Sequence, residues 1–324
     1  MITVYFGTNR RPNRKQNPTD FTGEFSVEGL ANLRFGQAEY DSARDVVRSV
    51  EVFHETPSGT VLGSAQLMGG LQERMRKNQA DALVFIHGFN VSFQDALRSA
   101  ARLQAAHSTA ERPLEVVAFS WPSDGSATHY PSDRHDAKAS GLAISRGFEK
   151  LIKFLHALDP ANACQRKIFL LCHSMGNYAL RCAVQEMIKQ YRTLPRVFHE
   201  IILAAADEDD DTFEVDHKLA RLPELADRVT VYFNRGDRAL TASDYLKGNP
   251  DRLGSNGPRK PRSVHAKVGL VDCTDVVSGL LEHDYYIGAA PVVADIRAVL
   301  AGVNSDQVAN RDYVVQSNRY RLRG

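Results

Sequence analysis

KIFLLCHSMGNYALRCAV, residues 167–184, joins an apolar strand to a helix through one tight turn. The run IFLLC is apolar at every position, which is typical of a strand covered on both faces of a parallel sheet. A helical pattern follows directly after Gly176. A serine at such a strand–turn–helix junction has the setting of a nucleophile elbow, where its hydroxyl stands exposed at the top of the sheet. The stretch therefore predicts an α/β fold and makes Ser174 the candidate nucleophile.

The elbow motif G-x-S-x-G is changed at one position. Its turn is tight, so the residues two before and two after the serine must be small. Gly176 meets this need, and Cys172 stands where the first glycine is usual. Cysteine is small enough to fit. The alternative is that Ser174 only caps a helix N-terminus, as serine commonly does.

Strand-like and helix-like segments alternate along the rest of the chain. Apolar, β-rich runs occupy residues 2–6, 50–54, 82–86, 114–119, 167–172, 200–205, 228–233 and 264–271. Helical patterns occupy residues 65–77, 93–106, 137–158, 178–191, 240–247 and 292–300, and Ser92 is the predicted N-cap of the second. The alternation predicts a mostly parallel, twisted sheet of about eight strands with helices on both faces.

Two regions interrupt this alternation. Residues 7–49 have weak periodicity, and residues 248–262 are loop-like because of their glycines and prolines. Residues 121–140 and 248–262 are both candidates for a lid, since long loops in compact domains are often functional. We expect a single domain over residues 1–324, with a polar, partly frayed tail after about residue 304.

ALVFIHGFN, residues 82–90, gives a second chemical signal. A buried strand ends here in His87, Gly88 and Phe89. An HG-type loop after an early strand supplies one backbone N–H of an oxyanion hole, and the residue after the nucleophile supplies the other. The expected donors are therefore Phe89 and Met175. The alternative is an ordinary glycine-containing turn with a structural histidine.

The acid and the histidine of a catalytic triad should follow later strands, in the order Ser–Asp–His. RVTVYFNRGDRAL, residues 228–240, ends a strand in a polar turn that contains Asp237. His283 lies in the loop-like stretch LLEHDYYIG after the strand that ends near Val271. In such a triad the histidine takes the serine proton, and the aspartate holds the imidazole tautomer and stabilises its charged form.

Two other aspartates compete for the role of the acid. Asp207 also ends a buried strand, IILAAAD, and is the alternative acid; Asp272 is a weaker candidate at the end of the last predicted strand. The acidic run at residues 207–211 lacks the spacing of a calcium loop, so we expect a solvated helix N-terminus there and no metal site.

Several further side chains are candidates for the substrate pocket. They are His87, Gly88, Trp121 and His173. Trp121 follows a buried strand, so it either forms an apolar pocket wall or packs the strand end. Among the other histidines, we expect His265 to be packed inside a strand, and His129 and His135 to be exposed.

Composition narrows the range of partners. The chain has 324 residues, with 40 Lys plus Arg against 39 Asp plus Glu, so no nucleic-acid partner is expected. No run approaches the roughly 20 apolar residues of a membrane span, and the first residues do not resemble a signal peptide. The four cysteines form no CxxC pair, and we expect Cys172 and Cys182 to be buried. These features favour a cytoplasmic protein without a cofactor, and they leave the oligomeric state open.

The chain resembles the bacterial α/β-hydrolases that are catalogued as a domain of unknown function. The matching segments are VYFGTNR, FIHGFN, AFSWPSDGS, CHSMGN, LAAADEDDDTF, VYFNRGDRALTAS, RLG and EHDYY, in this order over most of the chain. The resemblance implies the α/β-hydrolase fold with a catalytic serine, and it implies Ser174, Asp237 and His283 as the triad by position.

A serine hydrolase is therefore the expected class, most specifically a carboxylesterase that cleaves a small ester through an acyl-enzyme. A lipase, thioesterase or acyltransferase would use the same triad, because fold does not fix substrate. The alternative from a different class is a non-catalytic protein of hydrolase fold that binds a ligand or a partner.

Overall fold

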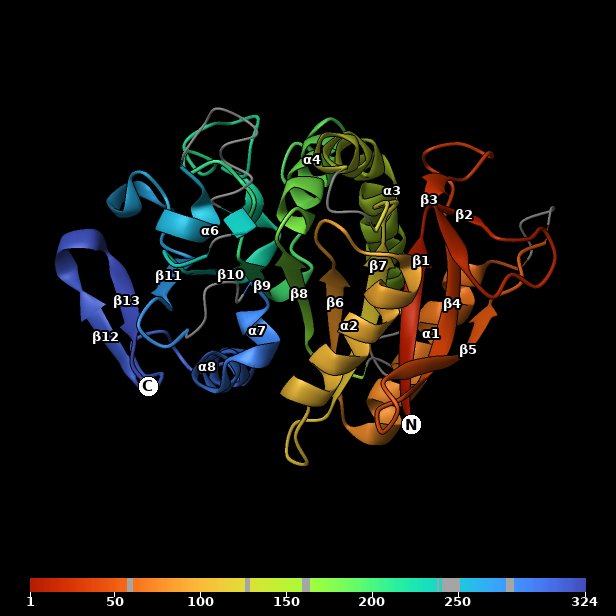
Figure 1. Ribbon diagram of the computed structural model, residues 1–324, viewed down its shortest axis with the longest axis horizontal. Helices are drawn as coiled ribbons and strands as arrows, with labels where there is room; N and C mark the ends of the chain where they lie inside the picture. Colours follow the sequence, from red (N-terminus) through yellow and green to blue (C-terminus); the bar gives the residue numbers. More distant parts are fainter. Residues whose placement is uncertain (57–60, 126–128, 159–163, 238, 241–250, 278–282) are drawn as a thin grey trace. The chain divides into compact units, whose positions relative to one another are not determined.

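The protein is described by a computed structural model (Figure 1), which covers residues 1–56, 61–125, 129–158, 164–237, 239–240, 251–277 and 283–324. The chain divides into two units, residues 1–168 and residues 169–324. The prediction of a single domain stays a prediction.

The first unit is built on a five-stranded sheet in the order β6-β7-β1-β4-β5. Its strands are β6 (Asp81–Ile86), β7 (Leu114–Ser120), β1 (Ile2–Thr8), β4 (Arg34–Asp41) and β5 (Val46–Val52). The pairs β6–β7 and β7–β1 are parallel, whereas β1–β4 and β4–β5 are antiparallel. A separate antiparallel pair joins β2 (Arg10–Pro12) and β3 (Phe21–Phe25). The predicted buried strands at residues 2–6, 82–86 and 114–119 are confirmed.

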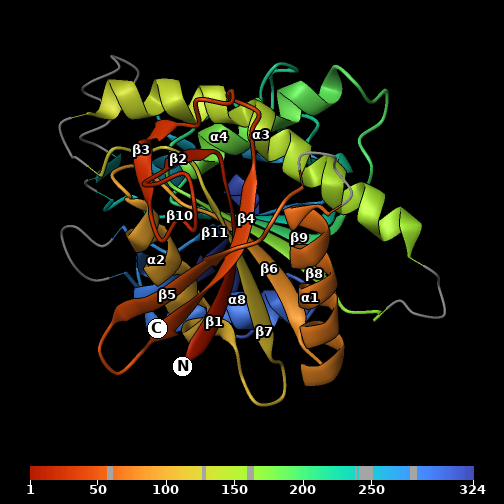
Figure 2. The same ribbon diagram turned by 90° about the vertical axis from the view of Figure 1, so that its right-hand side faces the viewer.

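Helices cover both faces of this sheet. They are α1 (Gly63–Asn78), α2 (Phe93–His107) and α3 (Tyr130–Ala157). On one face, the ring of Phe6 packs edge-on against Phe93 of α2, with centroids 5.1 Å apart. On the other face, Gly7 lines an apolar hollow together with residues of α1 and α3. Figure 2 shows α1 and α2 on opposite sides of the strands. Ser92 caps α2 as predicted, accepting the Asp95 N–H at 3.2 Å.

The second unit carries the strands in the order β8-β9-β10-β11-β13-β12. They are β8 (Ile168–His173), β9 (Phe198–Ala204), β10 (Ala226–Phe233), β11 (Val268–Asp272), β13 (Arg319–Leu322) and β12 (Arg311–Val314). All neighbours pair in parallel except β12, which is antiparallel to β13. Its helices are α4 (Gly176–Ile188), α6 (Leu253–Asn256), α7 (Tyr285–Gly288) and α8 (Ala290–Leu300). Single 3-10 turns occur at Leu222–Glu224, Pro261–Ser263 and Val315–Ser317.

The described residues contain 13 strands, more than the roughly eight expected. The strands that the sequence does not reveal lie in the first 50 residues and at the C-terminus. They are partly exposed or irregular, so their residues are polar on one face. The tail after residue 304 is therefore not frayed but forms β12 and β13. The predicted loop at 248–262 includes α6, and the predicted helix at 240–247 lies outside the described residues after Leu240.

Three smaller expectations have mixed outcomes. His265 is exposed and precedes β11 rather than lying packed in a strand, so that prediction is wrong. Cys172 is buried as predicted, but Cys182 is only half-buried. His129 and His135 are exposed, as predicted. Among the described residues, no helix is long and apolar enough to cross a membrane.

Candidate active site

Ser174 occupies the turn between β8 and α4 with a left-handed backbone φ of +52°. This conformation is uncommon for a residue with a side chain, and such strain persists only where the surroundings enforce it. The Ser174 N–H donates to the carbonyl of Ala204 at 3.1 Å. The side-chain amide of Asn177 donates to the carbonyls of Cys172 and Ser174, at 3.1 and 3.0 Å, and so ties both sides of the turn together. The serine itself is only 7% exposed.

His283 and Asp237 lie together in the second unit. The Nδ1 atom of His283 is 2.6 Å from Oδ2 of Asp237. Asp237 follows β10 and is buried, and its Oδ1 accepts the backbone N–H groups of Ala239 and Leu240 at 3.1 and 3.2 Å. The carboxylate is therefore fixed on one side by the backbone and presents its other oxygen to the imidazole. A carboxylate on Nδ1 fixes the tautomer that leaves Nε2 unprotonated.

Two opposing effects act on the pKa of His283. Burial disfavours the imidazolium and lowers the pKa, whereas the hydrogen bond and charge of Asp237 raise it. The more distant carboxylates of Asp284 and Asp207 add to the second effect, and the pKa ends above that of a free histidine. An imidazole in this setting is well suited to accept a proton, because its charged form is stabilised.

His173, the residue before the elbow serine, packs directly on His283. Their ring centroids are 4.6 Å apart. The ring of Tyr286, a residue of α7, also packs on His173, with centroids 4.7 Å apart. The Nε2–H of His173 donates to the backbone carbonyl of His283 at 3.2 Å. Burial and the charge of His283 lower the pKa of His173 to about 4, so the ring is neutral near pH 7. His173 thus links the elbow to the loop that carries His283.

Asp207, the alternative acid, has a different environment. Its backbone N–H donates to the carbonyl of Ser174 at 3.2 Å, and its carboxylate lies 3.6 Å from the Arg252 guanidinium. The acidic run at 207–211 is not a solvated helix N-terminus, so that expectation is wrong. Asp207 and Glu208 are buried, and Glu208 pairs with Arg181 at 3.2 Å. Buried carboxylates need such partners, because an unpaired charge is costly away from water.

Asp272, the weaker candidate acid, also has cationic partners. Its carboxylate lies 3.4 Å from Arg319 and 3.6 Å from Arg235. Its strand β11 is not the last, because β12 and β13 follow it. Both features favour a structural role for Asp272.

The HG loop belongs to the first unit, and His87 and Trp121 pack together beneath it. Their rings are stacked, with centroids 5.1 Å apart, and the Trp121 indole N–H donates to the carbonyl of His87 at 2.9 Å. Both side chains are almost fully buried. Of the two interpretations of Trp121, packing at the strand end therefore fits better than a pocket wall.

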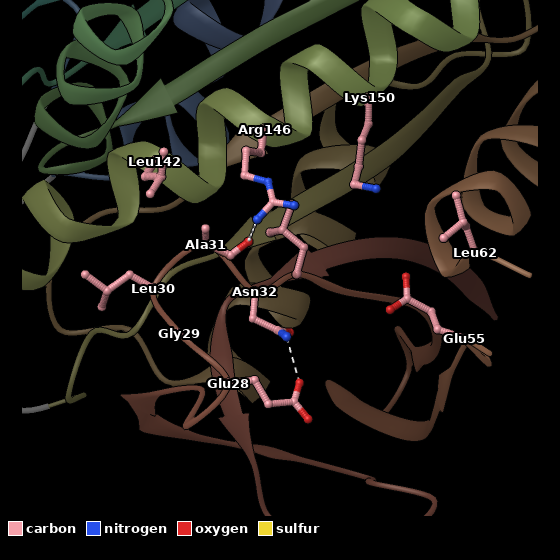
Figure 3. Close-up of a pocket in the computed structure, with 11 residues that line it drawn as sticks. Glu28, Gly29, Leu30, Ala31, Asn32, Glu55, Leu62, Leu142, Arg146 and Lys150 are labelled. Atoms are coloured by element: carbon pink, nitrogen blue, oxygen red, sulfur yellow. Dashed lines mark hydrogen bonds between the residues drawn. The ribbon is translucent and has the colours of Figure 1, made fainter. Parts of the chain in front are cut away.

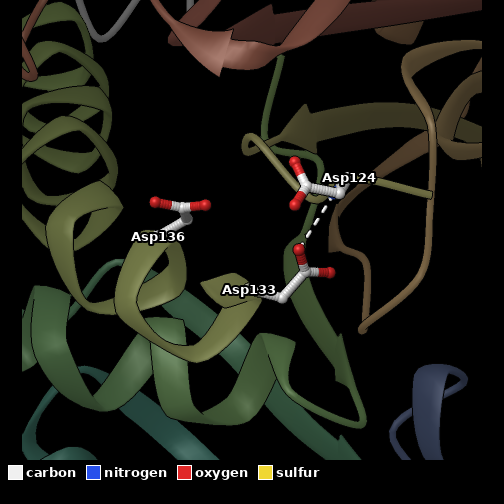
Figure 4. Close-up of side chains that lie close together, drawn as sticks. All are labelled: Asp124, Asp133 and Asp136. Atoms are coloured by element: carbon white, nitrogen blue, oxygen red, sulfur yellow. Dashed lines mark hydrogen bonds between the residues drawn. The ribbon is translucent and has the colours of Figure 1, made fainter. Parts of the chain in front are cut away.

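Asp133 connects the HG loop to the loop after β7. Its carboxylate accepts the Asn90 N–H at 3.2 Å, the Asp124 N–H at 2.9 Å and the hydroxyl of Ser123. Figure 4 shows its carboxylate beside Asp124, joined by the hydrogen bond, with Asp136 to one side on the same helix. Oxygen atoms of the three carboxylates lie within 4.8 Å of one another. Because Asp133 already accepts three hydrogen bonds from the two loops, we assign the cluster a structural role.

Arg10 is a second connection that the sequence does not reveal. It follows β1, is fully buried, and donates to the carbonyls of Val91 and Ser123 at 2.7 and 3.0 Å. Burial lowers the pKa of its guanidinium to about 9, and the charge of Asp133 partly offsets this effect. The only sequence signal for Arg10 is its place at the end of the segment VYFGTNR.

The two expected oxyanion donors each have a free backbone N–H. Met175 is buried at the N-cap of α4, where helices leave their first N–H groups without intrahelical acceptors. Phe89 lies in the HG loop, with its ring edge-on to Tyr130. Among the described residues, neither N–H has a hydrogen-bond acceptor.

Residues 64–302 match the sequence model of a family described as an alpha/beta hydrolase of unknown function (DUF900). Among curated proteins, the chain is 25% identical over 188 residues to the uncharacterized protein alr1448 of Nostoc sp. (strain PCC 7120 / SAG 25.82 / UTEX 2576). That match covers 50% of this chain and 47% of the relative, so the chain spans about half the length of the curated relative.

Solved structures with some similarity include two esterases and a lipase. The Pyrobaculum calidifontis esterase has 13% identity and a TM-score of 0.36, covering 93% of this chain and 88% of its own. Aspergillus fumigatus lipase B has 9% identity and a TM-score of 0.40, and the match covers 70% of this chain and 53% of the lipase chain. Esterase B from Lactobacillus rhamnosis has 12% identity and a TM-score of 0.39, covering 92% and 89%. These scores are too low to assign an activity to this chain.

Proposed function

Because the chain belongs to the alpha/beta hydrolase family of unknown function and has the fold that its sequence predicts, we propose that it is a serine hydrolase, specifically a carboxylesterase. Ser174 is the proposed nucleophile, His283 the general base and Asp237 the acid. No cofactor has a role in this chemistry. The proposed substrate is a small ester.

The proposed reaction assigns one step to each of these groups. Nε2 of His283 takes the proton of the Ser174 hydroxyl as the oxygen attacks the ester carbonyl. The oxyanion that forms accepts a hydrogen bond from the Met175 N–H. Phe89 is proposed from the sequence motif as the second donor. Each such donor stabilises the transition state by roughly 3 kcal/mol. His283 then gives its proton to the leaving alcohol, and water cleaves the acyl-enzyme by the same route.

The contact between His283 and Asp237 is the observation that best supports this proposal. A buried carboxylate 2.6 Å from Nδ1, held by two backbone N–H groups, gives the imidazole the tautomer and orientation that a general base needs. The hydrogen bond and ring contact between His173, the residue before Ser174, and His283 also support the proposal. A non-catalytic binding protein has no need for this combination.

A fluorophosphonate probe and a panel of p-nitrophenyl esters of graded acyl length test the proposal. The wild-type protein is expected to be labelled and to hydrolyse at least the short esters. Ser174→Ala should abolish both signals, while Ser49→Ala, at an exposed position on β5, should leave them unchanged. Full ester hydrolysis by folded Ser174→Ala would exclude the proposed nucleophile.

A further inference from the structure

A cavity of about 560 Å³ lies within the first unit, between the segment 28–33 and helix α3. Figure 3 shows Arg146 and Lys150 extending from α3 toward this segment, with Glu28 and Glu55 on the opposite side. Eight of the eleven lining residues precede residue 64, where the family match begins. The other three, Leu142, Arg146 and Lys150, lie within the match, and the lining includes none of Ser174, Asp237 and His283.

Arg146 and Lys150 form the cationic wall of the cavity. They are four residues apart on α3, so they lie on the same face of the helix. The Arg146 guanidinium donates to the carbonyl of Ala31 at 2.9 Å, and the Lys150 ammonium donates to the hydroxyl of Ser64 at 3.3 Å. In the described part of the chain, neither cation has a carboxylate oxygen within 4.0 Å. Both retain donors that an anionic ligand can use.

The two carboxylates of the cavity do not neutralise this wall, because a third cation holds them. Arg34 pairs with Glu28 at 2.6 Å and lies 3.7 Å from Glu55. Glu28 also accepts the side-chain amide of Asn32 at 2.6 Å, and Glu55 accepts the Gly63 N–H at 3.2 Å. The repulsion that two free glutamates would exert on an anion is thereby reduced.

Three leucines give the cavity an apolar part. Leu30, Leu62 and Leu142 are 46%, 41% and 37% exposed, and all three line it. Leu142 is four residues before Arg146, so the apolar and cationic groups share one face of α3. Exposed large apolar side chains that cluster at a hollow are typical of a ligand site, whereas scattered ones are ordinary.

We propose that this cavity binds a monomeric amphipathic anion, with a carboxylate or phosphate head on Arg146 and Lys150 and a hydrocarbon tail along the leucines. Charge complementarity selects the head, since neither Arg146 nor Lys150 has a carboxylate partner among the residues that the structure describes. The exposed leucines select the tail, because burying them removes apolar surface from water. This site is independent of the proposed esterase reaction, and its presence or absence leaves that proposal unchanged.

Isothermal titration of the full chain with decanoate, decyl phosphate and decanol, each below its micellar concentration, tests the site. We expect both anions to bind and decanol to bind at least tenfold more weakly. The Arg146→Gln/Lys150→Gln variant should weaken binding of both anions at least tenfold. Lys153→Gln removes the same charge from an exposed position on α3 outside the cavity, and should leave binding unchanged.

Three outcomes would overturn the proposal. They are the absence of anion binding to the wild type, equal binding of decanol, and undiminished binding to the double variant after circular dichroism has shown it to be folded. Undiminished binding to the double variant would place the anion at another site, such as the pocket of Ser174. Binding to vesicles of anionic phospholipid without binding of monomeric amphiphile would also overturn it, in favour of a membrane surface. Ser174→Ala should bind decanoate as the wild type does.

Discussion

Ser174 has a left-handed backbone conformation although it carries a side chain. Its backbone affects stability, and its hydroxyl is the proposed nucleophile. A non-glycine residue in this region costs roughly 1–2 kcal/mol, because its Cβ approaches the following carbonyl. Ser174 has a φ of +52°, although a glycine at this position would adopt the same φ without strain. The proposed role of the hydroxyl as nucleophile accounts for a serine at this strained position.

Two substitutions at Ser174 separate strain from chemistry. Ser174→Gly should raise the free energy of unfolding by about 1 kcal/mol relative to Ser174→Ala, because only glycine adopts a positive φ without strain. Both variants should be inactive. Urea denaturation of the two proteins in parallel gives the difference. Equal stability would show that the surroundings of the turn, and not its backbone, limit the choice of residue.

Asp237 and Asp207 differ in their contacts, and this difference predicts their effects on turnover. Asp237→Asn should lower kcat about 10³–10⁴-fold, because an amide facing Nδ1 favours the wrong imidazole tautomer. Asp207→Asn should lower kcat less than tenfold, since its carboxylate is directed to Arg252. Steady-state kinetics on one short ester measure both effects. A larger loss for Asp207→Asn would reverse the assignment of the acid.

The pH dependence of kcat/KM provides a separate test of the same contact. A general base acts when neutral, so activity should rise with pH as His283 loses its proton, with a midpoint above the ordinary histidine value because its pKa is raised. In Asp237→Asn the main raising effects are lost while burial remains, so the midpoint should move to lower pH. Residual activity measured from pH 5 to 9 supplies both midpoints. A midpoint that does not move would exclude control of this base by Asp237.

At the scale of elements, the HG loop is held from beneath by side chains that are distant in sequence. Asp133, at the start of α3, binds the loops after β6 and β7 together, and Arg10, the first residue of β2, adds further contacts. These connections fix the backbone directly after Phe89, at Asn90 and Val91. For Phe89 as the proposed oxyanion donor, the hydrogen bonds of Asp133 and Arg10 therefore determine the direction of its N–H.

Asp133→Asn tests this positioning role. An asparagine keeps one acceptor oxygen but turns the other into a donor, so at least one of the three hydrogen bonds is lost. We expect kcat to fall about tenfold with little change in KM, because an oxyanion contact acts on the transition state. Asp136→Asn, three residues further along α3 and in the same acidic cluster, should leave kcat unchanged. A loss of thermal stability without a loss of kcat would limit Asp133 to a structural role.

The elements that the sequence predicts are those buried on both faces. In β6 and β8 nearly every residue is apolar, so the run is visible without any partner. In β12, polar and apolar residues are mixed and the pattern is too weak to assign, and in β5, which is similarly mixed, the predicted strand at 50–54 matches only the last residues of Val46–Val52. His265 was misassigned for a related reason, since the apolar run of β11 begins only at Val268.

The site is predicted where a local motif marks it. The elbow and the HG loop are contiguous in sequence, and Asp237 and His283 follow from the order of strands. The support around them is not contiguous: Arg10 reaches Ser120, 110 residues away, with Nε 2.8 Å from the hydroxyl. His173, a predicted residue of the substrate pocket, packs on His283, and these two residues are also 110 apart in sequence. Only the fold brings such pairs together.

At the scale of the whole molecule, the family match leaves out both ends of the chain. Residues before 64 supply β1, β4 and β5, and residues after 302 supply β12 and β13. The strands β1, β4 and β5 lie at one end of the strand order in the first unit, and β12 and β13 lie at one end of the order in the second. The ends are therefore part of the folded structure, and the first of them also forms most of the proposed anion site.

A fully buried ion pair joins strand β12 to helix α8, and it predicts how much the stability of the molecule depends on the C-terminal strands. Arg311 of β12 donates to both carboxylate oxygens of Asp295 on α8, at 2.7 and 2.6 Å, and both side chains are 1% exposed. The hydroxyl of Tyr232 on β10 donates to the same carboxylate at 2.6 Å. Breaking a buried pair on one side leaves an uncompensated charge, which costs about 3–5 kcal/mol.

Arg311→Met should therefore lower the free energy of unfolding by about 3–5 kcal/mol, as measured by urea denaturation. Adding Asp295→Asn should recover at least half of the loss, because the amide carries no charge and its oxygen still accepts the Tyr232 hydroxyl. Arg323→Met, which removes an exposed pairing with Asp312 at the end of the chain, is the matched control and should cost less than about 1 kcal/mol. If the single and double variants lose the same stability, the charge of Asp295 is not what the C-terminal strands compensate, and their contribution comes from the pairing of β13 with β11 alone.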